Sequence, residues 1–409
     1  MAIRSKVKEK YDIGKSEYMW AKKSMPILTR LTHRFVSKRC LENFKLGICL
    51  HITKETSVLL MALKDAGAEI NLCPANPLSI QEPVKSFLLN NDIKIFSKKD
   101  DSLLDFYMNM EGVLDTNPHI LTDDGGELHK RALCRRFNVV GGTEETTSGI
   151  NRLMAWDKEG LLMYPIIAVN RSRTKHLFDN KYGTGQSTIE GILKTTGILL
   201  SSKRIVVCGY GWVGKGVARC AMGMGAKVMI TEVNPLRALE AYFDGFDVKP
   251  LDEVISNADI FITCTGQVNV IGKDHIEKIK EGAILCNAGH FDVEIDINYL
   301  NSIDQNHFSP RMNVECYRVG ECKKKIYLLA KGRVINLVGA EGNSPEVMSI
   351  SFANQFLSIV YLSRFHEKLC NQIYKTPKRI ETMIILTALD SFGLKIDSLT
   401  QQQKNYFKT

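Results

Sequence analysis

The chain has 409 residues, of which 44% are hydrophobic and 24% are charged. With 30 glycines and 11 prolines it differs from disordered and low-complexity proteins, and it is long enough for two or three domains. The formal net charge of +9 is spread along the chain, and no basic block is longer than Lys323-Lys324-Lys325. This pattern favours a solvated surface over a nucleic-acid partner.

The cysteines and the apolar segments indicate the compartment. Eleven cysteines without a CxxC pair are typical of reduced thiols in the cytoplasm. The first residues contain no apolar signal core, and no apolar run reaches the length of a membrane span, so we expect neither secretion nor a membrane partner. We expect no metal site, because no spacing such as HExxH occurs.

The first half of the chain alternates short apolar runs with helical patterns, which predicts a parallel α/β architecture. The first predicted strand is followed by a helix to about Asp65, with Gly67 as its stop. Strands are expected at 44–50, 69–72, 93–96, 119–121, 138–140 and 165–169.

Polar side chains follow five of these strands. They are His51, Asn76, the pair Asp123 and Asp124, the pair Glu144 and Glu145, and Asn170. A single Asp or Asn at such a place often only caps the next helix. Ligands in open α/β sheets bind outside the carboxyl ends of the strands, so the five together predict a site at this edge.

A dinucleotide-binding fingerprint occupies the middle of the chain. A strand at 204–208 runs into the glycines Gly209, Gly211 and Gly214, and a helical pattern, a strand at 227–230 and Glu232 follow. The glycines allow a tight turn, approach of a pyrophosphate to the backbone and close helix packing. An acid after the second strand accepts hydrogen bonds from ribose hydroxyls and repels a 2′-phosphate. The sequence therefore predicts NAD on a Rossmann-type domain.

Two further features surround this fingerprint. Strands at 259–263 and 283–286 continue the predicted sheet, and each ends in a polar turn, at 265–266 and 287–290. The run from Ser187 to Glu190 has the pattern of a capping box, which predicts the start of a helix that leads into the NAD domain.

The chain resembles the S-adenosylhomocysteine hydrolase (adenosylhomocysteinase) family over nearly its whole length. The matching stretches are CLHITKET at 49–56, DDGG at 123–126, EETTSG at 144–149, TKHLFDNKYGTGQS at 174–187, CGYGWVGKG at 208–216, NAGHFDVEID at 287–296, GRVINL at 332–337 and SFANQ at 351–355. The resemblance implies tightly held NAD and a place in the methylation cycle of one-carbon metabolism.

The resemblance also implies a reaction. NAD oxidises the 3′-hydroxyl of the substrate, and the ketone acidifies the 4′ hydrogen. Loss of that proton lets the 5′-thiolate of homocysteine leave, water adds to the alkene, and NADH reduces the ketone. The products are adenosine and homocysteine.

Roles carry over to the matching positions. In the catalytic set, Lys175 takes the 3′-hydroxyl proton with its pKa lowered by burial and neighbouring cations, Asp179 orients Lys175, Glu145 binds the 2′-hydroxyl, and His51, Asp124 and His290 serve the 5′ leaving group. The expected substrate contacts are Thr53, Glu55, Asn170 and Asn343. The expected cofactor contacts are Thr146, Thr147, Ser148, Asn180, Gly209, Gly211, Trp212, Val213, Gly214, Glu232, Thr265, Gly266 and Asn336.

Each of these residues also has a purely structural interpretation. His51 fits a hydrogen-bonded core histidine, and the spacing of Lys175 and Asp179 fits a surface ion pair on a helix. Glu145 fits a charge in the first turn of a helix, and His290 fits a cap.

Five features depart from the family pattern. Arg171 stands where an acid is usual, Asn343-Ser344 replaces His-Pro after Gly342, Ile80 replaces a Thr, and Ser148 replaces the third Thr of its run. The chain also ends at Thr409, as short-tailed prokaryotic members do, without the longer tail whose Lys and Tyr close a neighbouring subunit's NAD site. The departures leave the redox residues in place and bear on the exact nucleoside.

We therefore expect an α/β protein in which a Rossmann-type NAD domain is inserted in a second α/β substrate domain, with a short C-terminal helical segment. The expected parts are 1–180 and 345–380 for the substrate domain, 185–344 for the NAD domain and 381–409 for the C-terminal segment, in a cytoplasmic homotetramer. The leading hypothesis is S-adenosylhomocysteine hydrolysis. The alternatives are a paralogue using the same chemistry on another nucleoside, such as a biosynthetic 5′-dehydratase, a non-catalytic NAD-binding regulator, and a 2-hydroxyacid dehydrogenase.

Overall fold

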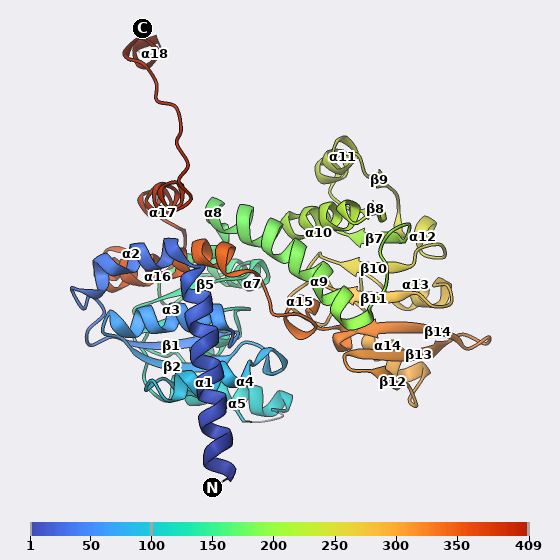
Figure 1. Ribbon diagram of the computed structural model, residues 1–409, viewed down its shortest axis with the longest axis horizontal. Helices are drawn as coiled ribbons and strands as arrows, with labels where there is room; N and C mark the ends of the chain where they lie inside the picture. Colours follow the sequence, from blue (N-terminus) through green and yellow to red (C-terminus); the bar gives the residue numbers. More distant parts are fainter. Residues whose placement is uncertain (1, 99–100, 407–409) are drawn as a thin grey trace.

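The computed structural model describes residues 2–98 and 101–406 and contains two α/β units side by side (Figure 1). The first is built on a seven-stranded sheet with the order β15-β6-β5-β4-β1-β2-β3, in which every pair of neighbours is parallel. Its strands are β1 (Lys45–Leu50), β2 (Glu69–Pro74), β3 (Lys94–Ile95), β4 (Ile120–Asp123), β5 (Gly141–Glu144), β6 (Ile166–Ala168) and β15 (Ile373–Lys375).

Helices cover both faces of this sheet (Figure 1). They are α1 (Ala2–Lys23), α2 (Pro26–Val36), α3 (Lys54–Asp65), the short η1 (Pro77–Ser79), α4 (Glu82–Leu89), α5 (Leu103–Leu114), α6 (Glu127–Cys134), α7 (Thr147–Lys158), α16 (Pro345–Phe365) and α17 (Lys378–Ser391). The helix expected up to Asp65 is α3, which begins at Lys54 because Thr53 caps it with its side chain.

The strand expected at 138–140 lies a few residues further on, at β5. Two glycines open this strand, and such glycines are typical of turns in sequence-based reasoning. The structure shows why Gly142 is there, because a Cβ at this position would lie 2.3 Å from the ring of His129. The strand ends at Glu144 rather than at residue 140, so Glu144 and Glu145 still lie at its carboxyl end as the sequence predicts.

The second unit contains an eight-stranded sheet with the order β12-β13-β14-β11-β10-β7-β8-β9. Its parallel part has the Rossmann arrangement, and β12 and β13 extend it with antiparallel pairs. The strands are β7 (Arg204–Cys208), β8 (Lys227–Thr231), β9 (Asp247–Val248), β10 (Ile260–Thr263), β11 (Ile284–Asn287), β12 (Phe308–Arg311), β13 (Val314–Val319) and β14 (Lys324–Leu329). The helices are α10 (Trp212–Gly223), α11 (Pro235–Phe243), α12 (Leu251–Val254), α13 (Lys273–Lys278) and α14 (Ile297–Ile303).

Two connections join the units. The first runs through α8 (Arg173–Lys175), the π-helical segment η3 (His176–Gly183) and α9 (Thr184–Thr196), and the second through α15 (Ile335–Val338) into α16. The predicted capping box at Ser187 is wrong, because helical structure continues from 173 to 196 without a break at this residue. Ser187 is buried inside α9, where its hydroxyl donates to Oδ1 of Asn343 at 2.7 Å and lies 3.4 Å from the carbonyl oxygen of Thr184.

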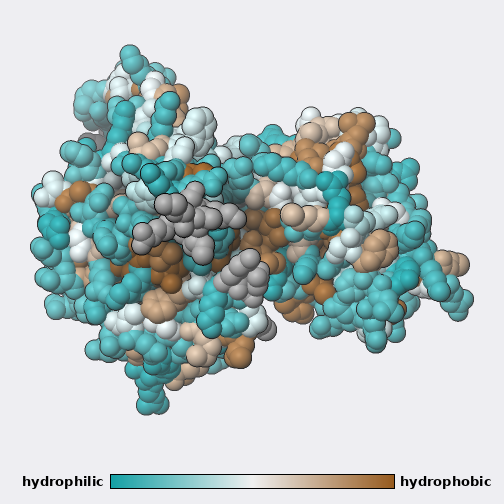
Figure 2. Space-filling model, turned by 60° about the horizontal axis from the view of Figure 1, so that its bottom comes forward, coloured by the Kyte–Doolittle hydropathy of each residue, from teal (hydrophilic) through white to brown (hydrophobic). Residues whose placement is uncertain are grey.

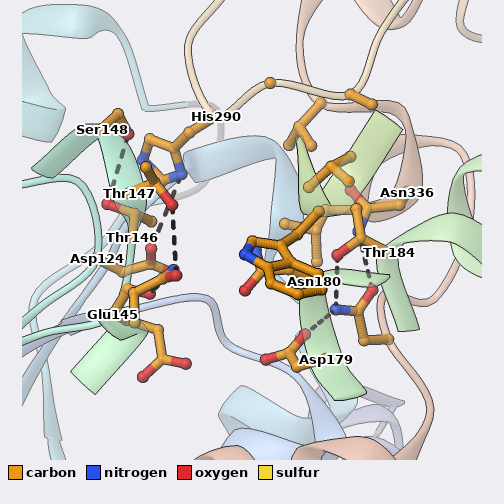
Figure 3. Close-up of a pocket in the computed structure, with 18 of the residues that line it drawn as sticks. Asp124, Glu145, Thr146, Thr147, Ser148, Asp179, Asn180, Thr184, His290 and Asn336 are labelled. Atoms are coloured by element: carbon orange, nitrogen blue, oxygen red, sulfur yellow. Dashed lines mark hydrogen bonds and ion pairs between the residues drawn. The ribbon is translucent and has the colours of Figure 1, made fainter. Parts of the chain in front are cut away.

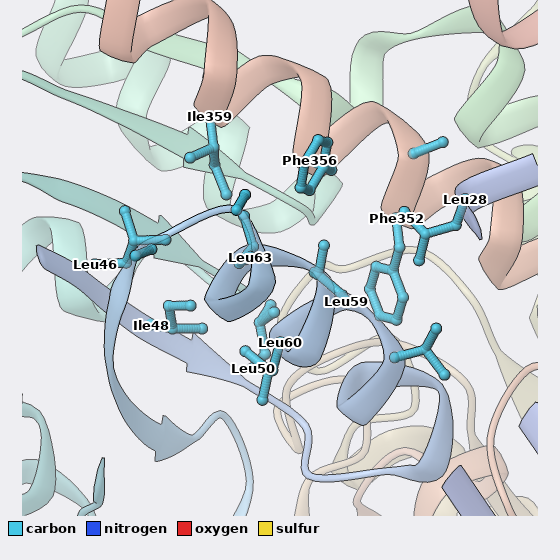
Figure 4. Close-up of a cluster of buried hydrophobic side chains, with 14 of the residues drawn as sticks. Leu28, Leu46, Ile48, Leu50, Leu59, Leu60, Leu63, Phe352, Phe356 and Ile359 are labelled. Atoms are coloured by element: carbon cyan, nitrogen blue, oxygen red, sulfur yellow. The ribbon is translucent and has the colours of Figure 1, made fainter. Parts of the chain in front are cut away.

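Helix α16 returns the chain to the first unit after the second sheet is complete, and β15 then pairs with β6. The α16 side chains Phe352, Phe356 and Ile359 pack into the same buried cluster as residues of β1, α2 and α3 (Figure 4). The Rossmann-type unit is thus inserted in the first unit, as the sequence predicts. The exact domain boundaries at 180, 185, 344 and 380 stay a prediction.

The end of the chain extends away from the first unit, from α17 to α18 (Gln401–Tyr406) (Figure 1). On the face seen in Figure 2 the surface is largely hydrophilic, and apolar side chains gather where the two units meet. Among the described residues, no helix has both the length and the apolar character needed to cross a bilayer.

The contribution of α16 to the core can be tested with Phe356→Ala. Phe356 is fully buried, so we expect this change to lower the free energy of unfolding by about 3–5 kcal/mol. Denaturant unfolding of the variant measures the loss. The control is Phe365→Ala at the exposed end of the same helix, and an equal loss in both variants would contradict the packing seen here.

Candidate active site

A cavity of about 330 Å³ lies between the two units. It collects side chains from the strand ends of both sheets and from both connections (Figure 3). The predicted site residues that line it are His51, Thr53, Glu55, Asp124, Glu145, Thr146, Thr147, Ser148, Asn170, Lys175, Asp179, Asn180, Gly211, Trp212, Val213, Thr265, Gly266, His290, Asn336 and Asn343. Gly209, Gly214 and Glu232 lie behind this lining, in the turn that shapes it.

Two pairs of acidic residues lie at strand ends, and the two members of each pair have different roles. Asp123, the last residue of β4, accepts hydrogen bonds from the backbone N–H groups of Asp124 and His129. Glu144, the last residue of β5, accepts from the N–H groups of Gly125 and Thr146. The first carboxylate of each pair therefore anchors a loop, and the second, Asp124 or Glu145, faces the cavity.

Asp124 lies between two histidines. Its Oδ2 is 3.5 Å from Nε2 of His51, and its Oδ1 is 3.8 Å from Nδ1 of His290. Burial lowers the pKa of His51 to about 4, although the charge of Asp124 opposes the shift. Burial also lowers the pKa of His290. Both rings are therefore suited to pass a proton without keeping it at neutral pH.

Ser79 determines which nitrogen of His51 is free. The hydroxyl of Ser79 donates to the carbonyl of Asn76 at 2.7 Å, so its oxygen accepts from Nδ1 of His51, also at 2.7 Å. The neutral ring then carries its proton on Nδ1, and Nε2 is the basic atom facing Asp124. Asn76, one of the five polar residues at strand ends, thus supports the site from behind its lining.

Lys175, Asp179 and Glu145 form a buried charged cluster. The Nζ atom of Lys175 is 2.9 Å from Oδ2 of Asp179 and 3.4 Å from Oε1 of Glu145. Both pairs are almost fully buried, so the interpretation as a surface ion pair is wrong. Because η3 is a π-helical segment, Asp179 reaches Lys175 inside the protein rather than on an exposed helical face.

The pKa of Lys175 differs from the expectation. Burial alone would lower it, but the carboxylates of Asp179 and Glu145 raise the pKa above its ordinary value. The prediction of a lysine tuned down by neighbouring cations is therefore wrong, since its close neighbours are anions. Burial raises the pKa of Glu145 to about 8, with Lys175 opposing and Asp179 adding to the shift. With this pKa, Glu145 is mostly protonated at neutral pH.

Helix α16 supplies partners that the site prediction missed. Ser351 donates to Oδ2 of Asp179 at 2.6 Å, and Gln355 donates to Oε2 of Glu145 at 2.6 Å. Both residues belong to the SFANQ stretch, so the sequence held a signal for them. Asn170 donates its amide to the backbone carbonyl of Glu145 and accepts from Thr147, which ties two loops together.

The second unit contributes a glycine-rich turn after β7. Gly209 has φ of +99°, and a Cβ on Gly214 would lie 2.0 Å from the carbonyl oxygen of Gly209. Gly211 precedes α10 with no side-chain cap, so the first N–H groups of this helix are free for a phosphate. These features fit a dinucleotide.

Glu232 and Arg237 surround this turn. The carboxylate of Glu232 accepts from the backbone N–H groups of Tyr210, Val233 and Asn234. It therefore shapes the turn and also places its charge where the adenosine ribose of NAD lies in Rossmann folds. Arg237, which the sequence prediction missed, lines the cavity and brings its guanidinium near Gly211.

The residues expected at the nucleobase lie at the α3 end of the cavity. Burial raises the pKa of Glu55, while Lys54, 3.5 Å away, opposes the shift. Oε1 of Glu55 is buried and makes no hydrogen bond within the described residues, although Nζ of Lys54 lies 3.5 Å from it. Thr146 caps α7 by accepting from Gly149, and Ser148 lies beside it.

Comparison with known proteins shows to which family the chain belongs. The model of the S-adenosyl-L-homocysteine hydrolase family matches residues 4–135, and the model of the NAD-binding domain of S-adenosyl-L-homocysteine hydrolase matches residues 180–342. The chain belongs to the S-adenosyl-L-homocysteine hydrolase family. Like its relatives, this family member is an enzyme with an NAD-binding domain.

Three relatives illustrate the similarity. Adenosylhomocysteinase of Sulfurisphaera tokodaii is 45% identical over 397 residues, which cover 97% of this chain and 95% of the relative. Adenosylhomocysteinase of Aquifex aeolicus is 43% identical over 401 residues, 97% of this chain and 96% of the relative. S-inosyl-L-homocysteine hydrolase of Methanocaldococcus jannaschii is 44% identical over 399 residues, 97% of this chain and 96% of the relative.

The role of Ser79 can be tested by nitrogen NMR of the His51 ring. In the native hydrolase we expect a single Nδ1–H tautomer, and in Ser79→Ala we expect a mixture because the acceptor for that proton is lost. Ser79→Thr, which keeps a hydroxyl, is the control. A spectrum of His51 unchanged in Ser79→Ala would refute the assignment.

Glu145 should make the stability of the ligand-free protein depend on pH. Its pKa is raised from 4.5 to about 8 in the fold, so between these values the folded state holds a proton that the unfolded state has lost. Its contribution to stability is therefore fully present below pH 4.5 and is lost as the pH rises through 8. Relative to Glu145→Gln, the native chain should lose about 2 kcal/mol between pH 6 and pH 8.

Denaturant unfolding at pH 6, 7 and 8 measures this difference. Exposed Glu159 at the end of α7 provides the control, and Glu159→Gln should leave the pH dependence of the native chain unchanged. Equal pH dependence in the native chain and in Glu145→Gln would show that Glu145 is not protonated in the fold.

Proposed function

We propose that this enzyme hydrolyses S-adenosyl-L-homocysteine to adenosine and L-homocysteine, reversibly and with tightly bound NAD. The observation that carries the proposal is one cavity that is lined by the Lys175 cluster, by the glycine-rich turn, and by His51 and Asp124 from the first unit with His290 from the NAD unit. Relatives that cover nearly the whole chain carry the name adenosylhomocysteinase. One cluster is suited to redox chemistry at a ribose hydroxyl and the other to proton transfer near C5′.

Bound NAD supplies the acceptor, and later the donor, of a hydride. Lys175 holds the 3′-oxygen with its ammonium and stabilises the negative charge that grows there during oxidation. It takes the hydroxyl proton after passing one of its own to a neighbouring carboxylate. Asp179, whose Oδ2 lies 2.9 Å from Nζ, is the carboxylate placed to receive that proton, because Glu145 with its raised pKa already holds one near neutral pH. Asp179 keeps Lys175 in place, and Glu145 also holds the 2′-hydroxyl.

The histidines act at the other end of the ribose. His51 offers an unprotonated Nε2 towards Asp124, so it can remove a proton from the substrate and return it to a leaving thiolate or to a water. Asp124 stabilises the imidazolium that forms in between. His290, on the far side of Asp124, assists and helps close the cavity from the NAD unit.

A second candidate function differs from the first only in the nucleobase of the substrate. Relatives in Methanocaldococcus jannaschii and Methanopyrus kandleri carry the name S-inosyl-L-homocysteine hydrolase and are 44% and 42% identical to this chain. A carboxylate at Glu55 accepts a hydrogen bond from the 6-amino group of adenine or from N1–H of hypoxanthine. The departures Arg171 and Ile80 do not line the cavity, so they give no support to a more distant substrate.

We also propose a cytoplasmic homotetramer. The C-terminal segment supports it, because Phe392, Leu394, Ile396 and Leu399 are all more than 45% exposed on a stretch that extends from the first unit. Apolar side chains arranged in this way are typical of a surface that another subunit covers.

The deciding experiment adds S-adenosyl-L-homocysteine to the purified protein and follows free thiol together with the absorbance of bound NADH. Thiol release with NAD recycled supports the proposal. Thiol release from S-inosyl-L-homocysteine alone supports the second candidate. Neither signal with either compound refutes both.

Two variants should separate the half-reactions. Lys175→Gln should slow reduction of bound NAD by adenosine by about 10²- to 10⁴-fold. His51→Asn should leave that reduction near the native rate and slow thiol release by a similar factor, because it acts after oxidation. Lys158→Met at the exposed end of α7 is the control and should change neither rate. Equal loss of both rates in His51→Asn would contradict the division of labour.

A further inference from the structure

Asn343 lies in the second connection between the two units, on the loop between α15 and α16. Its Nδ2 donates to Oδ1 of Asp179 and, at 3.1 Å, to the hydroxyl of Thr184. Its Oδ1 accepts from Ser187 at 2.7 Å and from Nδ2 of Asn336 at 3.2 Å. An amide has two donor hydrogens and two acceptor lone pairs, so all of its hydrogen-bonding capacity is used within the protein.

The partners of this amide come from three different parts of the chain. Asp179 lies in η3 and Thr184 and Ser187 lie on α9, both in the first connection, whereas Asn336 lies on α15 in the second connection. Figure 3 shows Asp179, Thr184 and Asn336 grouped at one wall of the cavity. The four bonds can therefore coexist only when the two connections lie against each other.

Asp179 depends on this arrangement. Its Oδ2 is held by Ser351 and by Nζ of Lys175, whereas its Oδ1 is held by Asn343. The charged groups that face it are Lys175 from the preceding helical turn and Glu145 from the end of β5, with Asp124 also on the cavity wall. Without the amide, Asp179 keeps its two partners at Oδ2 but loses the bond that fixes Oδ1, and Lys175 has Oε1 of Glu145 as its alternative partner at 3.4 Å.

We propose that Asn343 is a positioning residue that holds Asp179 against Lys175 and makes this geometry depend on how the two units are placed. The proposal rests on the proposed function for the roles of Lys175 and Asp179. The proposal also explains what changes when Asn343 stands where other members of the family have a histidine. A neutral imidazole has one donor and one acceptor, so it cannot make the four bonds of the amide.

Part of the expectation for Asn343 changes accordingly. The sequence predicted a contact with the nucleoside at this position. The side-chain amide is already occupied by four protein groups, so the backbone is the part of Asn343 that is free to meet a nucleoside.

The test uses three single variants, Asn343→Ala, Asn343→His and Ser187→Ala, and one double variant that combines Asn343→Ala and Ser187→Ala. All are studied in the full-length protein with its NAD. Reduction of bound NAD by adenosine is measured from pH 6 to pH 9. We expect Asn343→Ala and Asn343→His to slow it by about 10-fold with a changed pH profile, and Ser187→Ala by about 3-fold. The double variant should equal Asn343→Ala, because Ser187 acts through the amide.

Ser344→Ala is the matched control. Ser344 follows Asn343 and precedes α16 without a side-chain capping bond, so its rate and pH profile should equal those of the native enzyme. NAD content and melting temperature are measured on every variant. A native rate and profile in Asn343→Ala would overturn the proposal, and so would a loss that follows NAD content alone.

A measurement without turnover separates this proposal from the proposed function. Nitrogen NMR of the Lys175 ammonium reports how slowly its protons exchange with water, and we expect fast exchange in Asn343→Ala and slow exchange in the native protein. Equal exchange in both would overturn the proposal even if no nucleoside reduces NAD. Failure of all nucleosides to reduce NAD in the native protein would instead refute the proposed function.

Discussion

The burial of one ammonium and two acidic groups, of which Glu145 has a raised pKa, in one cavity is the constraint on which the rest of this structure depends. Ions without partners are costly to remove from water, so Lys175, Asp179 and Glu145 require one another and require further hydrogen-bond donors. Those donors come from α16, through Ser351 and Gln355, about 170 to 210 residues later in the chain. The site is therefore complete only when the chain has returned from the NAD unit. The insertion of the NAD unit thus lies between the residues of the cluster and the helix that supplies their hydrogen-bond donors.

The same logic explains the paired carboxylates at the strand ends. Parallel strands place their carboxyl ends at one edge, where loop N–H groups lack partners within the sheet. Asp123 and Glu144 satisfy these groups, which fixes the loops that present Asp124 and Glu145. A buried carboxylate that accepts several backbone hydrogen bonds is a rigid support, and a proton-transfer group needs such a support to keep its geometry. Each pair thus combines a support with a reactive group.

The departures from the family pattern have unequal weight in the structure. Arg171 is exposed and Ile80 packs at the edge of the first core, so neither reaches the cavity. Ser148 keeps a hydroxyl at the cavity wall. Asn343 differs from these because its amide joins both connections to Asp179. The substitution therefore changes how the catalytic cluster is supported more than it changes the surface offered to a nucleoside.

The sequence by itself determined the class of fold, the NAD fingerprint, the strand ends that carry polar residues and the family. These features depend on local periodicity and on glycines that are required by a positive φ, as at Gly209, or by close packing of the backbone, as at Gly214, so they can be read from short stretches. It did not determine the sign of the pKa shift of Lys175, the groups that support the catalytic side chains, or the continuity of the helix through Ser187. Those properties depend on neighbours far apart in sequence, such as Ser351 beside Asp179 and Ser79 beside His51. Only the tertiary structure brings these groups within hydrogen-bonding distance, and electrostatic and hydrogen-bond energies are decided at that range.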